Sequence, residues 1–283
     1  MATSCGFDSR RPHQMPVAAI PDHMSITAYL INLDRSPDRL VRMQARFDEI
    51  GADFVRIPAV DGKTLNDAAR KAACVPHKAW LPLTASEIGC FLSHRACWQQ
   101  IADGPAPYGC VFEDDMLLAP RLRDFLADRS WIPADAEIVK IEEGHNRVWL
   151  DMPLCDVTAG FRLGRLRSTH YRAGAYIVSR DAARRLLAMT ERFGLPVDLF
   201  LFDAAVGEPS RFVIYQLLPA LAEQEKGAAL EVKGGGGTIV RSGFRREDEF
   251  ARQRRRYADE LRKLWHRLRG RQRMAVGFDG SES

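Results

Sequence analysis

The stretch from Tyr108 to Leu118, with the sequence YGCVFEDDMLL, limits the fold of this chain more than any other. An apolar run typical of a buried β-strand is followed at once by three consecutive carboxylates, Glu113, Asp114 and Asp115. Neighbouring carboxylates repel one another, and carboxylates without a partner are costly to bury. A strand that carries three of them at its end therefore predicts that a cation lies close by.

The cation that best suits this pattern is a hard divalent ion. Mg²⁺ and Mn²⁺ prefer oxygen ligands and are commonly held by one or two carboxylates together with the phosphates of a substrate. In open α/β sheets, ligands bind at the carboxyl ends of the strands. The acidic run therefore indicates a metal–diphosphate site. The alternative is a solvated acidic turn, which is common between structural elements.

The first residues of the domain predict a parallel sheet. Ile26–Leu33 has the β-branched and aromatic content of a strand, and Asp53–Ile57 forms a second one. Between them, Ser36 and Pro37 suit the start of a helix, apolar residues recur at three- and four-residue spacing, and Gly51 ends it. Such a strand–helix–strand unit favours parallel strands with a right-handed crossover, and hence an α/β fold.

The turn after the first strand carries basic residues instead of a glycine-rich loop. No GxGxxG pattern is present there, which argues against a dinucleotide-binding enzyme. Arg35 and Arg39 could contact a nucleotide or its phosphates. The alternative is that they pair with Asp34 and Asp38 at the surface, and the residues alone leave both possibilities open.

A longer helix is predicted to begin at Thr84, because Thr84 and Glu87 have the spacing of a capping box. Ser93 and His94 lie inside this helix. A single histidine in such a helix is more often structural than catalytic. Adjacent residues do not face each other on a helix, so the pair does not form a serine–histidine catalytic unit.

Further acidic residues follow later in the chain. The predicted strand Ala136–Ile141 ends in Glu142 and Glu143, which either border the same crevice or form a surface turn. Asp198 follows Pro196 and Val197, and it either takes part in catalysis or caps a helix.

The composition divides the 283 residues into five parts. Apolar content of 46% and charged content of 28% are ordinary for a globular protein, and no apolar stretch approaches the ~18 residues that a membrane-spanning helix needs. The predicted parts are a disordered lead-in at 1–24, an α/β domain at 25–232, a glycine-rich linker at 233–244, a basic amphipathic helix at 245–273 and a disordered tail at 274–283.

Basic charge is concentrated near the C-terminus. Residues 245–273 hold 12 Lys and Arg against 5 Asp and Glu, whereas the whole chain has a net charge of only +4, so the body is mildly acidic. A helix at 245–270 with one apolar face could lie on an anionic membrane or pack on the domain, and both remain open. We expect no nucleic-acid partner, because no known binding signature is present.

The cysteines and the N-terminus bear on localisation. Six cysteines are scattered without a CxxC pair, which favours a reducing compartment. The N-terminus lacks the apolar core of a signal peptide. We therefore expect a cytoplasmic protein, located peripherally on the inner membrane if the basic helix binds lipid.

Several of these stretches together resemble glycosyltransferase family 25, the lipopolysaccharide-type galactosyltransferases related to collagen galactosyltransferases. The resemblance covers roughly residues 26–220 and rests on the order and spacing of short motifs. These motifs are YLINLDR at 29–35 with Arg39, AVDG at 59–62, LT at 83–84, EIGC at 87–90, LSH at 92–94, VFEDD at 111–115, AGAY at 173–176 and PVD at 196–198.

The resemblance implies a GT-A type fold, with a Rossmann-like mixed sheet flanked by helices. It implies that a hexose passes with inversion from UDP-galactose or UDP-glucose to a saccharide or glycolipid acceptor. A Mn²⁺ or Mg²⁺ ion would bind Glu113, Asp114 and Asp115, although GT-A enzymes usually have aspartate where Glu113 stands.

The resemblance also implies which residues surround the donor and the acceptor. The candidate donor-binding residues are Asn32, Leu33, Arg35, Arg39, Asp61, Ser93, His94 and Asp114. Inversion needs a general base for the acceptor hydroxyl. The candidate bases are Asp198, Glu142 and Glu143.

Two other functions remain open at this level. The same acidic run would serve a metal-dependent nucleotidyltransferase or phosphohydrolase, and a nucleotide-sugar-binding protein without catalysis could retain it. The acceptor is not determined by the sequence. Neither is the choice between galactose and glucose, because it rests on a few contacts to one hydroxyl.

Overall fold

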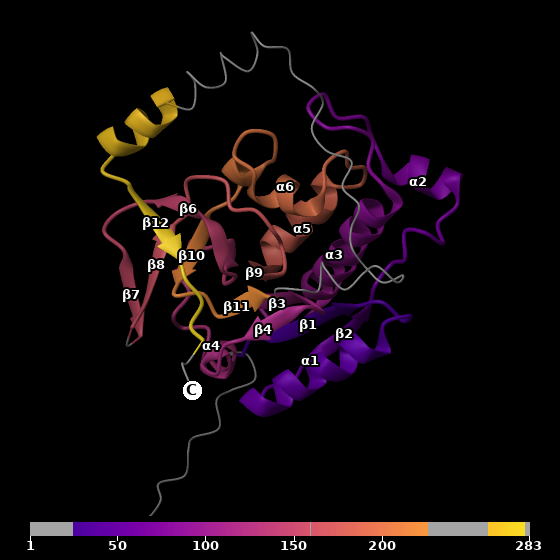
Figure 1. Cartoon of the computed structure of the whole chain (residues 1–283), viewed down its shortest axis with the longest axis horizontal. Helices are drawn as coiled ribbons and strands as arrows, with labels where there is room; N and C mark the ends of the chain where they lie inside the picture. Colours follow the sequence, from indigo (N-terminus) through magenta and orange to yellow (C-terminus); the bar gives the residue numbers. More distant parts are fainter. Residues whose placement is uncertain (1–24, 159, 226–259, 281–283) are drawn as a thin grey trace, which may run out of the picture.

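The computed structural model describes residues 25–158, 160–225 and 260–280. In these residues an eight-stranded mixed sheet has helices on both faces (Figure 1), which confirms the predicted α/β class. The predicted lead-in at 1–24 and linker at 233–244 lie outside the described residues, as does the first part of the predicted basic helix.

In chain order the elements are β1 (Thr27–Asn32), α1 (Pro37–Ile50), β2 (Val55–Pro58), α2 (Asp67–Ala73), α3 (Ala85–Asp103), β3 (Tyr108–Glu113), β4 (Met116–Leu118), α4 (Leu122–Ala127), β5 (Ile138–Lys140), β6 (Gly144–Leu150), β7 (Cys155–Thr158), β8 (Phe161–Arg165), β9 (Ala175–Ser179), α5 (Arg180–Met189), α6 (Val197–Phe202), η2 (Pro209–Arg211), β10 (Ile214–Leu218), β11 (Ala222–Gln224), helical residues 260–268 and β12 (Gln272–Val276).

The strand order of the main sheet is β2-β1-β3-β9-β5-β10-β8-β7. β1 is parallel to β2 and β3, as the strand–helix–strand pattern predicts, and β5 is parallel to β10. β9 lies antiparallel between β3 and β5, so β1, β3, β5 and β10 all run in the same direction. Their carboxyl ends therefore meet at one edge of the sheet.

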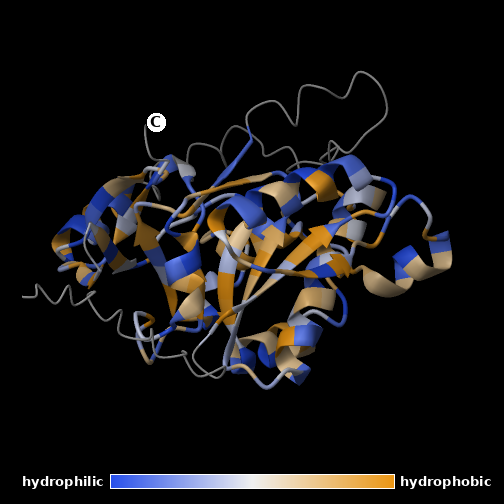
Figure 2. Cartoon of the chain, turned by 90° about the horizontal axis from the view of Figure 1, so that it is seen from below, coloured by the Kyte–Doolittle hydropathy of each residue, from blue (hydrophilic) through white to orange (hydrophobic). Residues whose placement is uncertain are grey.

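The central strands are buried on both faces. Leu30 and Phe112 point toward α1, where they pack with Phe47, while Ile31 and Val111 point toward α3, α5 and α6. Successive residues of a strand face opposite sides, so a strand covered on both sides reads as continuously apolar. Figure 2 shows this arrangement as apolar strands in the middle of the molecule and hydrophilic residues on the outer helices.

The helix boundaries follow the predicted signals. α1 begins at Pro37, and Gly51 ends it in the left-handed conformation, with φ of 64°. α3 has the predicted capping box: the Thr84 hydroxyl accepts from the Glu87 amide at 3.3 Å, and Glu87 Oε2 accepts from the Thr84 amide at 2.8 Å.

The C-terminal residues differ from the sequence prediction. A helix through 273 and a disordered tail from 274 were expected, but the helix ends near residue 268 and β12 pairs antiparallel with β6. Val276 of this strand joins Val148, Leu150 and Ala220 in a small apolar cluster. The prediction was wrong here because the apolar residues of 274–276 pack against a distant strand, which a local pattern does not reveal.

No helix among the described residues is both long enough and apolar enough to cross a membrane.

Candidate active site

The acidic run lies where the sheet topology brings strand ends together. Glu113 is the last residue of β3 and lies opposite Ile31 of β1, so the end of β1, Asn32, is its neighbour. Asp114 and Asp115 form the turn into β4, which pairs with β11. The predicted position at the carboxyl edge of the sheet is therefore confirmed.

Asp114 and Asp115 share one arginine. Arg39 of α1 binds Asp114 Oδ1 at 3.0 Å through Nη1 and Asp115 Oδ2 at 3.1 Å through Nη2. The Asn32 amide donates to Asp114 Oδ2 at 2.7 Å, and the Gln224 amide donates to Asp115 Oδ2 at 3.0 Å. Asp115 Oδ1 is buried and has no hydrogen-bond partner among the described residues.

The single guanidinium does not balance the acidic pair. Burial, followed by repulsion from Glu113, raises the pKa of Asp115 to about 6. Burial also raises the pKa of Asp114, although Arg39 and Asn32 oppose this shift. The positive charge at the site is therefore too small to neutralise the pair, and Asp115 Oδ1, which has no hydrogen-bond partner among the described residues, is a suitable ligand for a hard divalent cation.

Glu113 has different partners from the two aspartates. Its Oε1 accepts from His94 Nε2 at 3.2 Å and lies 3.7 Å from the Cys90 thiol. Burial opposes its ionisation, but the His94 hydrogen bond and nearby positive charges outweigh burial and lower the pKa. The ligand atoms of Cys90, His94 and Glu113 all lie within 4.8 Å of one another, a spacing that a metal ion could also bridge.

The turn after β1 is held by arginines. Arg35 Nε donates to Asp61 Oδ2 at 2.7 Å, and this hydrogen bond is the main cause that lowers the pKa of Asp61. The expected alternative pairing does not form, because Asp34 pairs with Arg56 and Asp38 with Arg42. Arg35 and Asp61 therefore form one ion pair in this turn, and Arg39 and Asp114 form another at the acidic run.

Asn32 and Leu33 have supporting positions in this turn. The Asn32 amide donates to the Ser36 carbonyl at 3.1 Å as well as to Asp114, and its Oδ1 accepts from Arg56 at 3.2 Å. The Leu33 carbonyl accepts from the Ser36 amide at 2.9 Å. Asn32 is only 1% exposed, so the described contacts give it the role of joining β1, β2 and the acidic run.

Ser93 lies behind the turn that carries Asp61. Its hydroxyl accepts from the Val60 amide at 2.8 Å and donates to the Gly89 carbonyl at 2.7 Å. At 1% exposure it has almost no surface for a ligand. The sequence predicts that Ser93 and His94 contact the donor directly. In the structure both side chains are buried, so they support the residues around the site instead.

Close backbone approach between α3 and the Asp61 turn leads to a testable prediction. A Cβ atom on Gly89 would lie 2.5 Å from both the Gly62 amide nitrogen and the Val60 carbonyl oxygen. We expect Gly89→Ala to lower the free energy of unfolding by about 1–3 kcal/mol, because helix and turn must separate. Urea denaturation measures this. Gly277→Ala is the control, since, apart from its chain neighbours, no atom of residues 25–158, 160–225 or 260–280 lies within 4 Å of that Cβ position, and an equal loss in both variants would contradict the prediction.

Glu142 is anchored in the protein interior. Its Oε2 accepts from Lys140 Nζ at 2.7 Å and from the Gly174 and Ala175 amides at 2.9 and 3.3 Å. Both Lys140 and Glu142 are 0% exposed. The prediction of Glu142 as a base does not fit this geometry, because its carboxylate cannot reach an acceptor. Glu143, the next residue, is half-buried.

Asp198 lies in the first turn of α6, and its Oδ1 accepts from the Leu199 amide at 3.0 Å. A carboxylate there is favoured by the helix dipole, which supports the structural alternative. Asp198 and Glu113 are also close enough to Lys140 for their charges to favour its protonated form, although burial lowers the Lys140 pKa. Asp198 therefore remains near the acidic edge, with 5% exposure.

Lys140, Tyr176 and Gln224 contact the predicted residues, although none of the three was predicted as a site residue. A signal for Lys140 was present: it is a lysine in an apolar strand, two residues before Glu142, so both side chains are expected on one face. Gln224 had no local signal, because it reaches Asp115 only through the pairing of β11 with β4.

His170 makes stability depend on pH. The carbonyl of Tyr171 can only accept, so His170 Nδ1 donates to it at 2.8 Å, while Nε2 is buried and has no hydrogen-bond partner within the described part of the chain. Burial, together with the charge of Lys140, lowers its pKa to about 3. The folded state thus binds fewer protons than the unfolded state between the unfolded value of ~6.5 and about 3.

We therefore expect the His170 contribution to stability to be lost as pH falls from ~6.5, at about 1.4 kcal/mol per pH unit. Urea denaturation at pH 7.0 and 5.5 measures this loss. Between these two pH values, the free energy of unfolding should fall by about 1.4 kcal/mol less in His170→Gln than in the wild type. His77→Gln is the control: burial also lowers the pKa of His77, but this side chain is only half-buried, so its effect on the pH dependence should be smaller than that of His170. An unchanged slope in the His170 variant would contradict the assignment.

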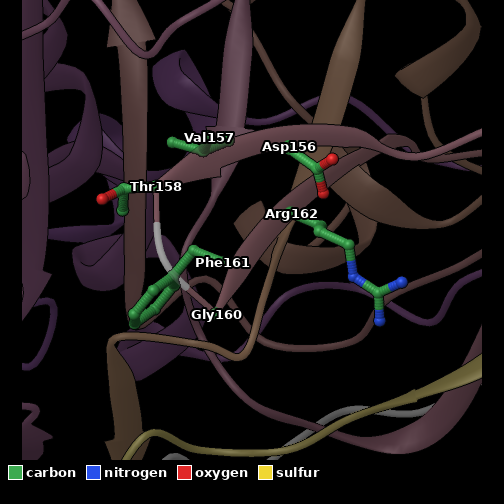
Figure 3. Close-up of a pocket in the computed structure, with 6 residues that line it drawn as sticks. All are labelled: Asp156, Val157, Thr158, Gly160, Phe161 and Arg162. Atoms are coloured by element: carbon green, nitrogen blue, oxygen red, sulfur yellow. The ribbon is translucent and has the colours of Figure 1, made fainter.

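A surface hollow of about 490 Å³ lies away from this site (Figure 3). It is lined by the β7–β8 hairpin, with Asp156 and Arg162 among its residues. It shares no residue with the acidic edge, so we assign it no part in the chemistry.

Comparison with family models gives a match over most of the α/β domain. The family model described as glycosyltransferase family 25 (LPS biosynthesis protein) matches residues 25–201, which include the acidic run and Asp198. This chain belongs to glycosyltransferase family 25. The matched segment of this family 25 chain ends before β10, so Gln224 and β12 lie outside it.

Similar proteins come from bacteria and a vertebrate. This family 25 chain is 32% identical over 213 residues to the lacto-N-neotetraose biosynthesis glycosyltransferase LgtB of Neisseria gonorrhoeae, covering 70% of this chain and 74% of that protein. It is 28% identical over 207 residues to the lipooligosaccharide biosynthesis protein lic2B of Haemophilus influenzae, covering 70% and 75%. It is 32% identical over 196 residues to procollagen galactosyltransferase 1-A of Xenopus laevis, covering 64% of this chain but 31% of that longer protein.

Proposed function

We propose that this glycosyltransferase moves a hexose from a UDP-sugar, most simply galactose from UDP-galactose, to a hydroxyl of a saccharide or glycolipid with inversion. The names of the relatives, which include a procollagen galactosyltransferase and proteins of lipooligosaccharide biosynthesis, support the donor and the acceptor class. The observation that carries the proposal is the pair of buried carboxylates at the carboxyl edge of the sheet, whose negative charge a single arginine does not balance.

A divalent ion, Mn²⁺ or Mg²⁺, would be held by Asp114 and Asp115, whose oxygens are of the type these ions prefer. When bound, such an ion supplies Lewis-acid neutralisation of the charge that develops on a departing diphosphate. Glu113 is held toward His94, so its Oε1 is already in use. Arg35 and Arg39, at the same edge, supply positive charge for the diphosphate oxygens.

The acceptor hydroxyl must lose its proton to a base on the face of the sugar opposite the leaving group. Asp198 and Glu143 keep some exposed surface, whereas Glu142 has none. We therefore propose the first two as candidate bases. The variants Asp198→Asn and Glu143→Gln separate them, because loss of the base lowers kcat while binding of the UDP-sugar is kept.

Calorimetric titration tests the proposal directly. UDP-galactose and UDP-glucose are titrated with and without Mn²⁺, and GDP-mannose serves as the mismatched nucleotide. We expect one UDP-sugar to bind in a metal-dependent manner and to yield a glycosylated product with a saccharide acceptor. Release of free hexose regardless of acceptor would instead indicate a phosphohydrolase, and binding without turnover would indicate an inactive binding protein.

Arg39 is the rival cation for the acidic pair, and Arg39→Gln separates the two. If a divalent ion competes with this guanidinium, Mg²⁺ binding without donor tightens about tenfold in the variant, the equivalent of one partly buried ion pair. UDP-sugar binding weakens because a phosphate partner is lost. Arg42→Gln, which breaks only an exposed pair with Asp38, is the control. Failure of the variant to bind metal more tightly would indicate that no ion competes at this site.

We further propose that the C-terminal helix places the enzyme on an anionic membrane, with a peripheral position on the inner membrane. Four apolar side chains share one face of this helix and are 45–78% exposed: Leu261, Leu264, Trp265 and Leu268. Arg262, Arg267 and Arg269 are also exposed on this helix. Apolar side chains flanked by arginine suit a lipid surface with negative headgroups.

The other side of this helix packs against β6, which pairs with β12 in a separate two-stranded sheet. The His266 ring stacks on Trp149 at 5.0 Å, and Arg271 Nε donates to Asp151 Oδ1 at 2.8 Å. Co-sedimentation with vesicles of phosphatidylcholine alone or with phosphatidylglycerol tests the surface. Binding should require the anionic lipid and be lost in Leu264→Glu combined with Leu268→Glu, and binding without lipid dependence would contradict it.

A further inference from the structure

Three buried side chains form a hydrogen-bonded chain that ends on the acidic run. Trp98 Nε1 donates to the Tyr176 hydroxyl oxygen at 2.7 Å, and the same oxygen lies 2.9 Å from His94 Nδ1. His94 Nε2 lies 3.2 Å from Glu113 Oε1. Trp98, Tyr176 and His94 are 0% exposed, so water cannot replace any of these partners.

The direction of each proton follows from the chemistry of the groups. An indole N–H only donates, so the Tyr176 oxygen accepts from Trp98. Burial keeps the pKa of Tyr176 well above its usual value, so the hydroxyl retains its proton. That proton is directed to the lone pair of His94 Nδ1, and a neutral imidazole then carries its own proton on Nε2. His94 Nε2 therefore donates to Glu113, whose ionised carboxylate can only accept.

The opposite tautomer does not suit the same contacts. With a proton on Nδ1, both His94 and Trp98 would donate to the Tyr176 oxygen. The His94 Nε2 lone pair would then face the Glu113 carboxylate, and two acceptors at 3.2 Å repel. A buried nitrogen or oxygen that lacks a hydrogen-bond partner destabilises the fold. The chain of contacts thus selects one tautomer.

We propose that Tyr176 and Trp98 are positioning residues, which hold His94 as the Nε2–H tautomer and through it tie Glu113 to α3. As a result, Glu113 Oε1 is not available as a metal ligand, and Asp114 and Asp115 bind the cation. The part that concerns the cation rests on the proposed function, whereas the tautomer does not. The inference also excludes a metal bridging Cys90, His94 and Glu113, because His94 Nε2 carries a proton and offers no lone pair.

NMR of the full chain labelled with ¹⁵N-histidine tests the tautomer without any assay of activity. Long-range ¹H–¹⁵N correlations distinguish the two tautomers and the charged form, and His94→Gln identifies the signals among the seven histidines. We expect the Nε2–H tautomer at pH 7, and a mixture of tautomers in Tyr176→Phe. A wild-type signal from the Nδ1–H tautomer would overturn the proposal.

Mg²⁺ affinity tests the consequence for the acidic run. If the chain keeps Glu113 Oε1 away from the cation, Tyr176→Phe releases this carboxylate as an additional oxygen ligand, so we expect Mg²⁺ to bind about tenfold more tightly in the variant. Tyr108→Phe is the matched control, because its hydroxyl donates to the Ala136 carbonyl at 3.0 Å in the same sheet. An equal change in both variants, or no tightening in Tyr176→Phe, would overturn the positioning role.

Two substitutions at residue 94 guard against misfolding as the explanation. Gln places an amide donor near the Nε2 position, whereas Asn places it near Nδ1. We expect His94→Gln to keep the wild-type Mg²⁺ affinity, because Glu113 stays held, and His94→Asn to bind Mg²⁺ more tightly, as Tyr176→Phe does. A Cys90-dependent sulfur–cobalt absorption band on titration with Co²⁺, absent in Cys90→Ser, would overturn the exclusion of a bridging metal. If the wild-type chain binds neither Mg²⁺ nor a UDP-sugar, the proposed function fails, and the NMR result still decides the tautomer.

Discussion

Replacing both Asp114 and Asp115 with asparagine is expected to abolish metal-dependent sugar transfer while the protein stays folded. Lewis-acid stabilisation of a leaving group is worth several kcal/mol, so the rate should fall by about a thousandfold or more. The fold should tolerate the change because burial and repulsion from Glu113 already raise the pKa of both groups. Transfer of labelled hexose measures the rate, and circular dichroism with thermal unfolding measures folding.

Asp124→Asn is the matched control, since it removes one carboxylate at an exposed position of α4. It should leave both the rate and the metal affinity unchanged. A double variant at 114 and 115 that retains full Mn²⁺-dependent activity would remove the acidic pair from the mechanism. A variant that no longer unfolds cooperatively would show instead that the pair mainly holds the turn between β3 and β4.

Replacing Lys140 with methionine is expected to destabilise the fold more than any other single change proposed here. Lys140 Nζ donates to Glu142 Oε2 at 2.7 Å and to the Arg172 carbonyl at 2.5 Å, and it lies 4.5 Å from the centre of the Phe202 ring. Without it, a fully buried carboxylate loses its counter-ion. Breaking one side of a buried pair costs about 3–5 kcal/mol, which urea denaturation followed by tryptophan fluorescence can measure.

The second substitution Glu142→Gln should restore a large part of that loss, because it removes the uncompensated charge while an amide oxygen can still accept from Gly174. Lys71→Met, at an exposed position of α2, should change the free energy of unfolding by less than about 0.5 kcal/mol. If Lys140→Met were as mild as this control, the buried pair would not contribute to stability in the way described.

Local patterns in the sequence predicted the parts of the fold that depend on neighbouring residues. The strand–helix–strand unit from Ile26, the capping box at Thr84 and the acidic end of β3 all occur where expected. Each is determined by a few residues close in sequence, through backbone hydrogen bonds and side-chain period. The GT-A type architecture followed from the resemblance, and the mixed sheet is consistent with it.

Contacts between distant segments could not be predicted in the same way. The antiparallel insertion of β9 between β3 and β5 depends on pairing across more than 60 residues, for which no local signal exists. The sequence likewise placed Ser93 and His94 beside the donor, whereas the structure shows both buried as supports. A motif indicates that a residue matters, but its distance from a ligand depends on the packed fold.

The pairing of β12 with β6 has a consequence for how the chain folds during synthesis. β1, β2 and β3 leave the ribosome first and can pair early, since domains assemble from the N-terminal side. Val148 and Leu150 have to wait until Val276 has been translated before their cluster closes. During that interval the edge of β6 is an unpaired strand, the kind of surface that chaperones protect and that associates with other chains.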